Sequence, residues 1–180
     1  MDNQQEIINQ CIANSRQGQE KLYRMFYPPL FALCRRLLPD DHEATEALNN
    51  GMLKVFKNIA SWQSGKGEFF NWMYTIVRNA ALDKLKAKKS ELNIKELKDE
   101  HNDESFYNPV KELEWKEIYK LSEALSPGTR AVFNLYYLEG LSVKEIAETL
   151  DLSAGTVKWH MNASREKLRP GLQKFFEKKV

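Results

Sequence analysis

The chain has 180 residues, of which 42% are hydrophobic and 29% are charged, a composition typical of globular domains and unlike that of disordered or collagen-like chains. At roughly 100 to 200 residues per domain, this length excludes a large multi-domain enzyme. The longest uninterrupted apolar run, Leu30 to Cys34, has five residues, whereas a bilayer span needs about 20, so we expect no membrane insertion. The polar, acidic residues 1–6 do not form a secretory signal, and we expect a cytoplasmic protein.

The net charge of +2 hides an uneven distribution along the chain. Residues 1–88 carry 12 Lys and Arg against 9 Asp and Glu, residues 89–109 carry 3 against 6, and residues 110–180 carry 12 against 10. The middle segment also has few large apolar groups and ends at Asn108-Pro109, which is typical of a linker. We therefore expect two domains, 1–88 and 110–180, joined by a flexible acidic linker.

Helical periodicity dominates both blocks, and no segment shows the sustained alternation that strands require, so we expect an all-α fold. In the first block the pattern predicts helices at about 4–16, 19–27, 30–38, 42–59 and 69–89. Gly18 is expected to close the first of these helices. Pro28 and Pro29 are expected to start or kink the third, and Asp41 to cap the fourth.

The second block is predicted to hold helices at about 113–125, 129–139, 142–150 and 154–168, with Pro170 interrupting the last. Gly140 is placed to end the second of them, and Ser142 to Glu145 form a capping-box sequence that starts the third. The last two helices form a helix-turn-helix pattern, with inward positions at Ile146, Leu150, Val157, Met161, Ser164 and Leu168.

The opposite face of the last helix has the side chains that read base edges and phosphates in a major groove: Gly155, Lys158, Trp159, Asn162 and Arg165. The alternative interpretation is an ordinary helical hairpin with a solvated charged face. The tail argues against that alternative, because residues 156–180 hold 7 basic residues against 2 acidic ones.

Aromatic residues gather around the loop 62–68 and in the helix that follows: Phe56, Trp62, Phe69, Phe70, Trp72 and Tyr74. Beside basic groups, such rings suit the stacking of unpaired bases. Composition alone favours the alternative, in which most of these rings form the core of a small helical domain, and we assign Trp72 and Tyr74 to that core.

Two motif sets follow one another along the chain. The first includes Tyr27-Pro28-Pro29-Leu30, Glu43-Ala44, Leu53-Lys54-Val55-Phe56 and Trp72-Met73-Tyr74-Thr75-Ile76-Val77-Arg78-Asn79. The second includes Glu139-Gly140-Leu141-Ser142, Glu145-Ile146-Ala147 and Gly155-Thr156-Val157-Lys158. In this order they resemble the sigma-2 and sigma-4 domains of the extracytoplasmic-function (ECF) sigma factors of bacterial RNA polymerase, over nearly the whole chain.

The resemblance implies a factor that binds core RNA polymerase, directs it to promoters and helps open the DNA. It implies no enzyme activity and no small-molecule substrate. In this family sigma-2 binds the clamp helices of the β′ subunit, and sigma-4 is expected at the β flap. The positions that match the clamp contacts are Glu43, Glu46, Asn49, Asn50 and Lys54. Family members usually carry an acidic residue at the position of Asn50, so one charge-assisted contact is weakened or replaced by a neutral hydrogen bond.

The resemblance also implies two DNA sites, one for single-stranded and one for double-stranded promoter DNA. The first captures an extruded base of the minus-ten box and matches Lys66, Glu68, Phe69 and Asn79. The second reads the minus-thirty-five box, with Lys158, Trp159 and Asn162 at base edges and Thr156, His160 and Arg165 at phosphates. The family usually has a small residue at the position of Trp159, which can instead pack against an anti-sigma partner.

Two other classes of protein were weighed. A stand-alone repressor or activator would use the helix-turn-helix as a homodimer, but no heptad seam is visible. An enzyme would need a nucleophile, a base or metal ligands, and the only histidines are His42, His101 and His160. Cys11 and Cys34 lie in apolar contexts and are interpreted as buried free thiols. We expect no metal and no cofactor.

Overall fold

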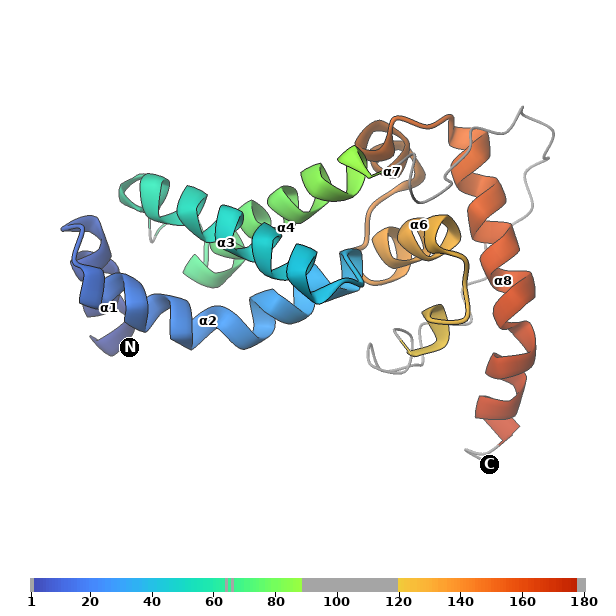
Figure 1. Ribbon diagram of the computed structural model, residues 1–180, viewed down its shortest axis with the longest axis horizontal. Helices are drawn as coiled ribbons and strands as arrows, with labels where there is room; N and C mark the ends of the chain where they lie inside the picture. The colour runs from blue at the N-terminus through green and yellow to red at the C-terminus, as the bar shows by residue number, and fades with distance from the viewer. Residues whose placement is uncertain (1, 64, 66, 89–119, 178–180) are drawn as a thin grey trace. The chain divides into compact units, whose positions relative to one another are not determined.

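The computed structural model describes residues 2–63, 65, 67–88 and 120–177, with side chains up to residue 170, and every regular element in these ranges is a helix (Figure 1). This confirms the all-α prediction. The chain divides into two compact units, Met1–Leu85 and Lys86–Val180. The linker predicted at 89–109, and all but the end of the helix predicted at 113–125, lie outside the described residues. None of the described helices is long and apolar enough to cross a membrane.

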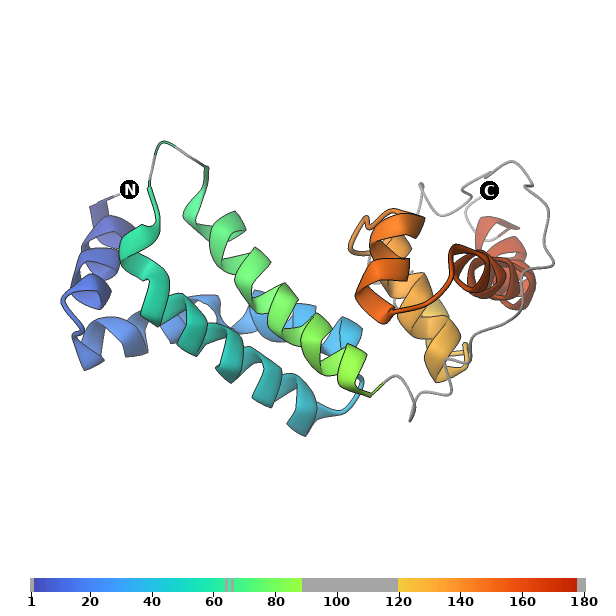
Figure 2. The ribbon, with the colours of Figure 1, turned by 90° about the horizontal axis from the view of Figure 1, so that it is seen from above.

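The first unit consists of α1 (Asp2–Ile12), α2 (Arg16–Leu37), α3 (Asp41–Asn58), the 3-10 turn η1 (Ile59–Ser61) and α4 (Phe69–Ala87) (Figure 2). A single helix, α2, replaces the two helices predicted on either side of Pro28. Both prolines of the Pro28-Pro29 pair lie inside it and are exposed, whereas Leu22, Leu30 and Leu33 on its inner face are fully buried. Tertiary burial of that apolar stripe keeps the helix continuous across the two missing N–H groups.

The turn between α1 and α2 corrects the prediction for Gly18. Helix α1 ends at Ile12, Asn14 takes the left-handed φ of 56°, and the hydroxyl of Ser15 caps α2 by accepting from the Gly18 N–H. A Cβ atom at Gly18 would lie 2.6 Å from the Cβ of Gln10. The glycine therefore permits the close approach of α1 and α2 instead of ending a helix. In the same way Asp40, and not Asp41, is the N-cap of α3.

A second glycine sets the spacing of α3 and α4. A Cβ atom at Gly51 would lie 2.8 Å from the Cα of Val77, closer than real Cβ contacts come. The side chains around this contact, Leu48, Met52 and Val55 on α3 and Met73 and Val77 on α4, are buried. Because the two backbones pack so closely, polar side chains at the rims of α3 and α4 can reach each other.

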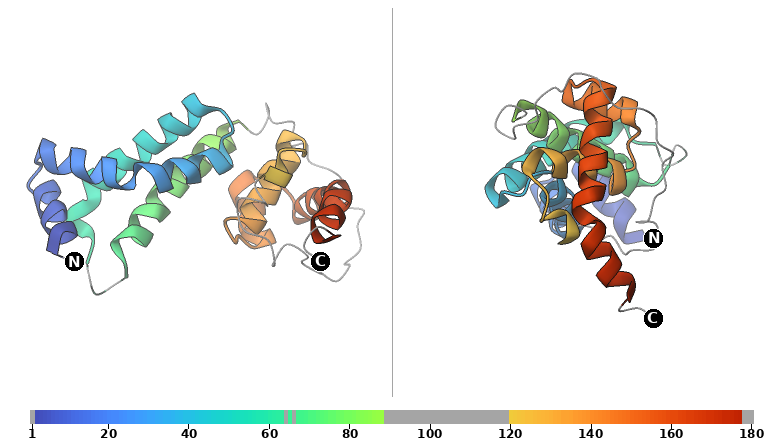
Figure 3. Two further views of the ribbon diagram at one scale, coloured as in Figure 1. Left: turned by 90° about the horizontal axis from the view of Figure 1, so that it is seen from below. Right: turned by 90° about the vertical axis from the view of Figure 1, so that its right-hand side faces the viewer.

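The second unit holds α6 (Pro127–Tyr137), α7 (Val143–Leu150) and α8 (Ala154–Glu177), with α8 packed against both other helices (Figure 3). The capping box between Ser142 and Glu145 is present, and Gly140 takes the left-handed φ of 69° expected of a helix-ending glycine. All six predicted inward positions of the helix-turn-helix are buried. Pro170 does not interrupt α8 as predicted, because its ring is exposed and one missing hydrogen bond does not end the helix.

Cys11 and Cys34 are buried and free, as predicted, and burial raises the pKa of the Cys11 thiol. No group of three His, Cys, Asp or Glu side chains within the described ranges is placed to hold a metal ion.

Candidate functional sites

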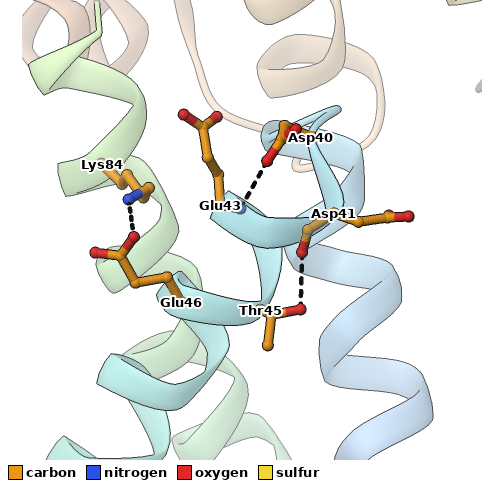
Figure 4. Close-up of polar contacts among 6 residues, drawn as sticks. All are labelled: Asp40, Asp41, Glu43, Thr45, Glu46 and Lys84. Carbon is orange, nitrogen blue, oxygen red and sulfur yellow. Dashed lines mark hydrogen bonds and ion pairs between the residues drawn. The ribbon is translucent and has the colours of Figure 1, made fainter.

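The polar outer face of α3 carries the five residues predicted to contact polymerase. Glu46, Asn49, Asn50 and Lys54 are exposed and Glu43 is half-buried. Two open grooves run along this face and share Glu46 and Asn50 in their walls. The face begins at a well-formed helix start, where Asp40 accepts a hydrogen bond of 2.9 Å from the Glu43 N–H (Figure 4).

Ion pairs with α4 hold two of these α3 side chains. Lys84 Nζ donates to Glu46 Oε2 at 2.6 Å, and Lys54 Nζ lies 3.3 Å from Asp83 Oδ2. The hydrogen bond and the charge of Lys84 lower the pKa of the Glu46 carboxyl. Figure 4 shows the Glu46 carboxylate and the Lys84 ammonium meeting between the two helices. Since both pairs are solvent-exposed, they contribute little stability, and their effect is to orient the charged groups.

Two further features of this face were not predicted from the sequence: a hydrogen bond from α2 and an exposed leucine. The Tyr23 hydroxyl of α2 donates to Asn49 Oδ1 at 2.8 Å, and Leu53 of α3 exposes 55% of its surface between the polar groups. The partners Asp83 and Lys84 lie 29 and 38 residues from the side chains they bind. No local pattern links such distant positions; only the exposed leucine in a polar helix face was open to detection.

The residues predicted at the minus-ten site differ in their exposure to solvent. Lys66 lies outside the described residues, whereas Glu68 and Asn79 are exposed. Phe69 is 1% exposed, and its ring meets Trp62 at 5.2 Å between centroids and Trp72 at 5.7 Å. Phe69 is therefore a core residue, and its assignment to the minus-ten site is corrected, because a ring must be accessible to contact a base.

Asn79 belongs to a row of exposed polar side chains that the sequence reasoning missed. Asn71, Thr75 and Asn79 stand four residues apart on α4, so they share one face of the helix. The Thr75 hydroxyl donates to the Asn71 carbonyl at 2.9 Å. The spacing of four was available in the sequence, but of these three positions only Asn79 matches the family's base-contacting site.

On α8 the structure separates the predicted DNA-facing residues into two groups. Lys158, Asn162 and Arg165 are half-buried, and Trp159 is 39% exposed. Thr156 and His160 are 0% and 5% exposed, so their predicted side-chain contacts with phosphate are corrected.

The two buried side chains of α8 serve the packing of the second unit. The Thr156 hydroxyl lies 3.0 Å from that of Ser153, which also caps α8 by accepting from the Thr156 N–H. His160 Nδ1 lies 3.0 Å from the Thr129 hydroxyl of α6, and burial lowers the pKa of the imidazole. A buried, neutral imidazole supplies no charge to a phosphate.

Arg165 is tied to two other polar groups. Its Nε donates to the Tyr137 hydroxyl of α6 at 3.3 Å, and its Nη1 donates to Asn162 Oδ1 at 3.4 Å. The exposed side of α8 thus combines an indole, an amide and two cations, a set able to contact both base edges and phosphates in a duplex groove.

Comparisons with known proteins identify the family of the chain. The family model described as Sigma-70 region 2 matches residues 22–91, and that described as Sigma-70, region 4 matches residues 115–168. The ECF RNA polymerase sigma factor SigW of Bacillus subtilis is 28% identical over 187 residues, which cover 93% of this chain and 97% of SigW. The chain belongs to the ECF sigma factor family. Region 2 thus contains the α3 and α4 faces, and region 4 contains the helix-turn-helix.

Two further matches were found. The ECF RNA polymerase sigma factor SigE of Mycolicibacterium smegmatis is 26% identical over 165 residues, which cover 88% of this chain and 60% of SigE. A solved structure of the sigma factor RpoE with the anti-sigma factor NepR from Bartonella quintana matches 86% of this chain and 96% of its own, with 20% identity and a TM-score of 0.44.

Proposed function

We propose that this sigma factor binds core RNA polymerase through the outer face of α3, directs it to promoters through two DNA sites, and helps separate the strands at the minus-ten box. One observation carries the proposal: the region 2 and region 4 matches occur in order, the first includes the exposed polar face of α3, and the second includes the half-buried polar side chains and the exposed indole of α8. The site of action would be the cytoplasm, where the polymerase is found.

The polymerase contact is proposed for Glu43, Glu46, Asn49, Asn50 and Lys54. The ion pairs with α4 support this assignment, because they hold Glu46 and Lys54 in fixed directions before a partner arrives. A side chain that is already ordered loses less conformational entropy on binding. The exposed Leu53 adds an apolar contact within the same face.

The minus-ten contact is proposed for the exposed row that ends in Asn79, with Glu68 at the start of α4. Amide and hydroxyl groups both donate and accept hydrogen bonds, so they suit the edge of a base removed from its stack. Strand separation would follow because a captured base favours the open duplex, and it needs no nucleotide hydrolysis.

The minus-thirty-five contact is proposed for Lys158, Trp159, Asn162 and Arg165 on α8. Arg165 supplies positive charge for phosphates, and Lys158, Trp159 and Asn162 can meet base edges. For Trp159, contact with an anti-sigma partner remains the alternative proposal. Its exposed indole is accessible to DNA or to a protein partner.

The test is reconstitution with bacterial core RNA polymerase. We expect co-elution in size exclusion and opening of promoter DNA, detected by permanganate reactivity of unpaired thymines. Glu46→Lys should weaken co-elution, because it places two like charges together with Lys84. Glu6→Lys is the matched control, as this exposed glutamate lies on α1 and far from α3 in sequence. Failure to co-elute, together with tight duplex binding by the chain alone, would favour a stand-alone regulator.

A further inference from the structure

The half-buried Arg165 of α8 is held from a neighbouring helix. Its Nε donates to the Tyr137 hydroxyl at 3.3 Å, and its Nη1 donates to Asn162 Oδ1 at 3.4 Å. The Tyr137 hydroxyl on α6 thus contacts Arg165 directly and is linked through its guanidinium to Asn162. Both of these residues belong to the proposed duplex-reading face of α8.

Tyr137 itself is fixed in place. It is the last residue of α6, and its ring lies 4.6 Å from that of Phe133 and 4.9 Å from that of Tyr136, between centroids. It also packs against the apolar cluster formed by Leu125, Phe133 and Leu168. The phenol oxygen therefore projects from a rigid base toward α8 and offers Arg165 one defined acceptor.

This arrangement matters because a free arginine side chain has many rotamers and loses them when it binds. Its guanidinium is planar, so fixing Nε also fixes the plane in which the other N–H groups point. A side chain ordered before binding avoids an entropy cost that otherwise lowers affinity.

We propose that Tyr137 is a positioning residue for duplex recognition: it orients Arg165, and through Arg165 the amide of Asn162, for contact with the minus-thirty-five box. The proposal rests on the proposed function of α8 as the reader of that box. Tyr137 does not itself touch DNA in this scheme. Its phenol oxygen acts only through the guanidinium.

The decisive variant is Tyr137→Phe, which keeps the ring and its packing and removes the acceptor oxygen. Binding is measured with holoenzyme on a promoter selected by the wild-type holoenzyme from a random-sequence library. We expect Tyr137→Phe to weaken binding about three- to tenfold, the effect of one immobilised side chain. On a template that lacks the minus-thirty-five duplex, the variant and the wild type should bind equally.

Salt dependence separates positioning from loss of a contact. Arg165→Ala should reduce the slope of log affinity against log salt by about 1, since one phosphate contact is lost. Tyr137→Phe should lower affinity with the slope unchanged, because Arg165 still reaches its partner. The double variant should match Arg165→Ala alone, because the phenol acts only through Arg165.

A matched control exists in the first unit, where Arg36 donates to the Tyr74 hydroxyl at 2.9 Å. Tyr74→Phe removes the same kind of bond and should leave the contribution of the minus-thirty-five box unchanged. Three results would each overturn the proposal. The losses of affinity could add up in the double variant, Tyr137→Phe could leave the affinity unchanged, or it could lower the affinity equally on both templates. A wild-type holoenzyme that is indifferent to the minus-thirty-five box would instead overturn the proposed function, and this inference with it.

Discussion

The two units bury different kinds of side chain. In the first unit, every described side chain that is buried is apolar, and the polar contacts between its helices lie at the surface or at its margin. In the second unit six described polar residues are buried: Ser122, Thr129, Asn134, Thr156, His160 and Ser164. The first unit is thus specified by shape and apolar pattern, and the second also by directional hydrogen bonds.

The difference follows from the size of the two cores. The first unit buries long apolar stripes from α2, α3 and α4, whereas α7 has only eight residues. A small apolar core leaves helix register poorly determined, and a buried hydrogen bond such as Thr129 to His160 fixes it, since a shifted helix would leave His160 Nδ1 without its partner. In the second unit, α8, the helix proposed to read duplex DNA, is therefore aligned by buried polar groups on its inner side.

The largest effect should come from a cavity in the first core. Leu33 is fully buried, so Leu33→Ala should lower the free energy of unfolding of the first unit by about 3 to 5 kcal/mol. Leu53→Ala is the matched control, because Leu53 is exposed and should change stability by less than about 0.5 kcal/mol. Hydrogen exchange on peptides of each unit measures both. Equal effects would mean that this core is not specified by packing.

Gly51 tests whether the first unit depends on the close packing of α3 and α4. Gly51→Leu should destabilise this unit by about 1 to 3 kcal/mol, because the new side chain meets the Val77 backbone. Gly65→Leu is the comparison variant, since a Cβ there meets no atom within 4 Å. Urea denaturation followed by tryptophan fluorescence reports the loss. An unchanged midpoint for Gly51→Leu would show that the helices separate freely.

The buried hydrogen bonds of the second unit are tested by Thr129→Val, which keeps the shape and removes the hydroxyl. We expect a loss of about 1 to 2 kcal/mol in the free energy of unfolding of the second unit, because His160 Nδ1 loses its partner. Thr75→Val on α4 is the matched control, as the Thr75 side chain is exposed. If both variants behave alike in hydrogen exchange, the buried hydroxyl does not stabilise the fold.

The smallest effect is a dependence of stability on pH that is confined to the second unit. Burial lowers the pKa of His160, so the unfolded chain binds a proton at a higher pH than the folded chain does. The stability is therefore fully present above the unfolded pKa of about 6.5 and falls below it, by at most about 1.4 kcal/mol per pH unit. His160 Nε2 has no hydrogen-bond partner in the described structure, so the charged imidazolium would carry one unsatisfied N–H group.

The readout for this pH effect is hydrogen exchange of α6 and α8 peptides between pH 7.5 and pH 5.5, corrected for the intrinsic exchange rate. His160→Gln should flatten the pH dependence, and His42→Gln, at an exposed position of α3, should leave it unchanged. A dependence that survives His160→Gln would assign the effect to another group.

The sequence predicted those parts of the candidate site that depend on residues within a single helix. The capping box at Ser142, the left-handed Gly140 and the inward row through Val157 and Met161 were all predicted, because each depends on residues within one or two turns. The helix-turn-helix and its exposed face followed directly. The proposed contacts at Lys158, Trp159, Asn162 and Arg165 keep their places on that face.

The corrected positions are those at which packing against a second helix determines whether the side chain is buried. Thr156 and His160 lie at the edge of the inward face of α8, and because α6 and α7 both pack against α8, the buried face is wider than periodicity alone indicates. Phe69 was placed at a DNA site because its position matches the family's base-capturing element, and only its ring neighbours show that the side chain lies in the core.

The sequence by itself determined most of the helices, the helix ends at Gly140 and Ser142 and the two-region organisation, because backbone hydrogen bonds and side-chain periodicity act over a few residues. Only the tertiary structure decided that α2 runs through Pro28 and Pro29, that Lys84 meets Glu46, and that Tyr137 meets Arg165. These outcomes depend on which surfaces pack together across tens of residues. Burial against a distant helix can outweigh a local helix-breaking signal, and nothing within a single turn records it.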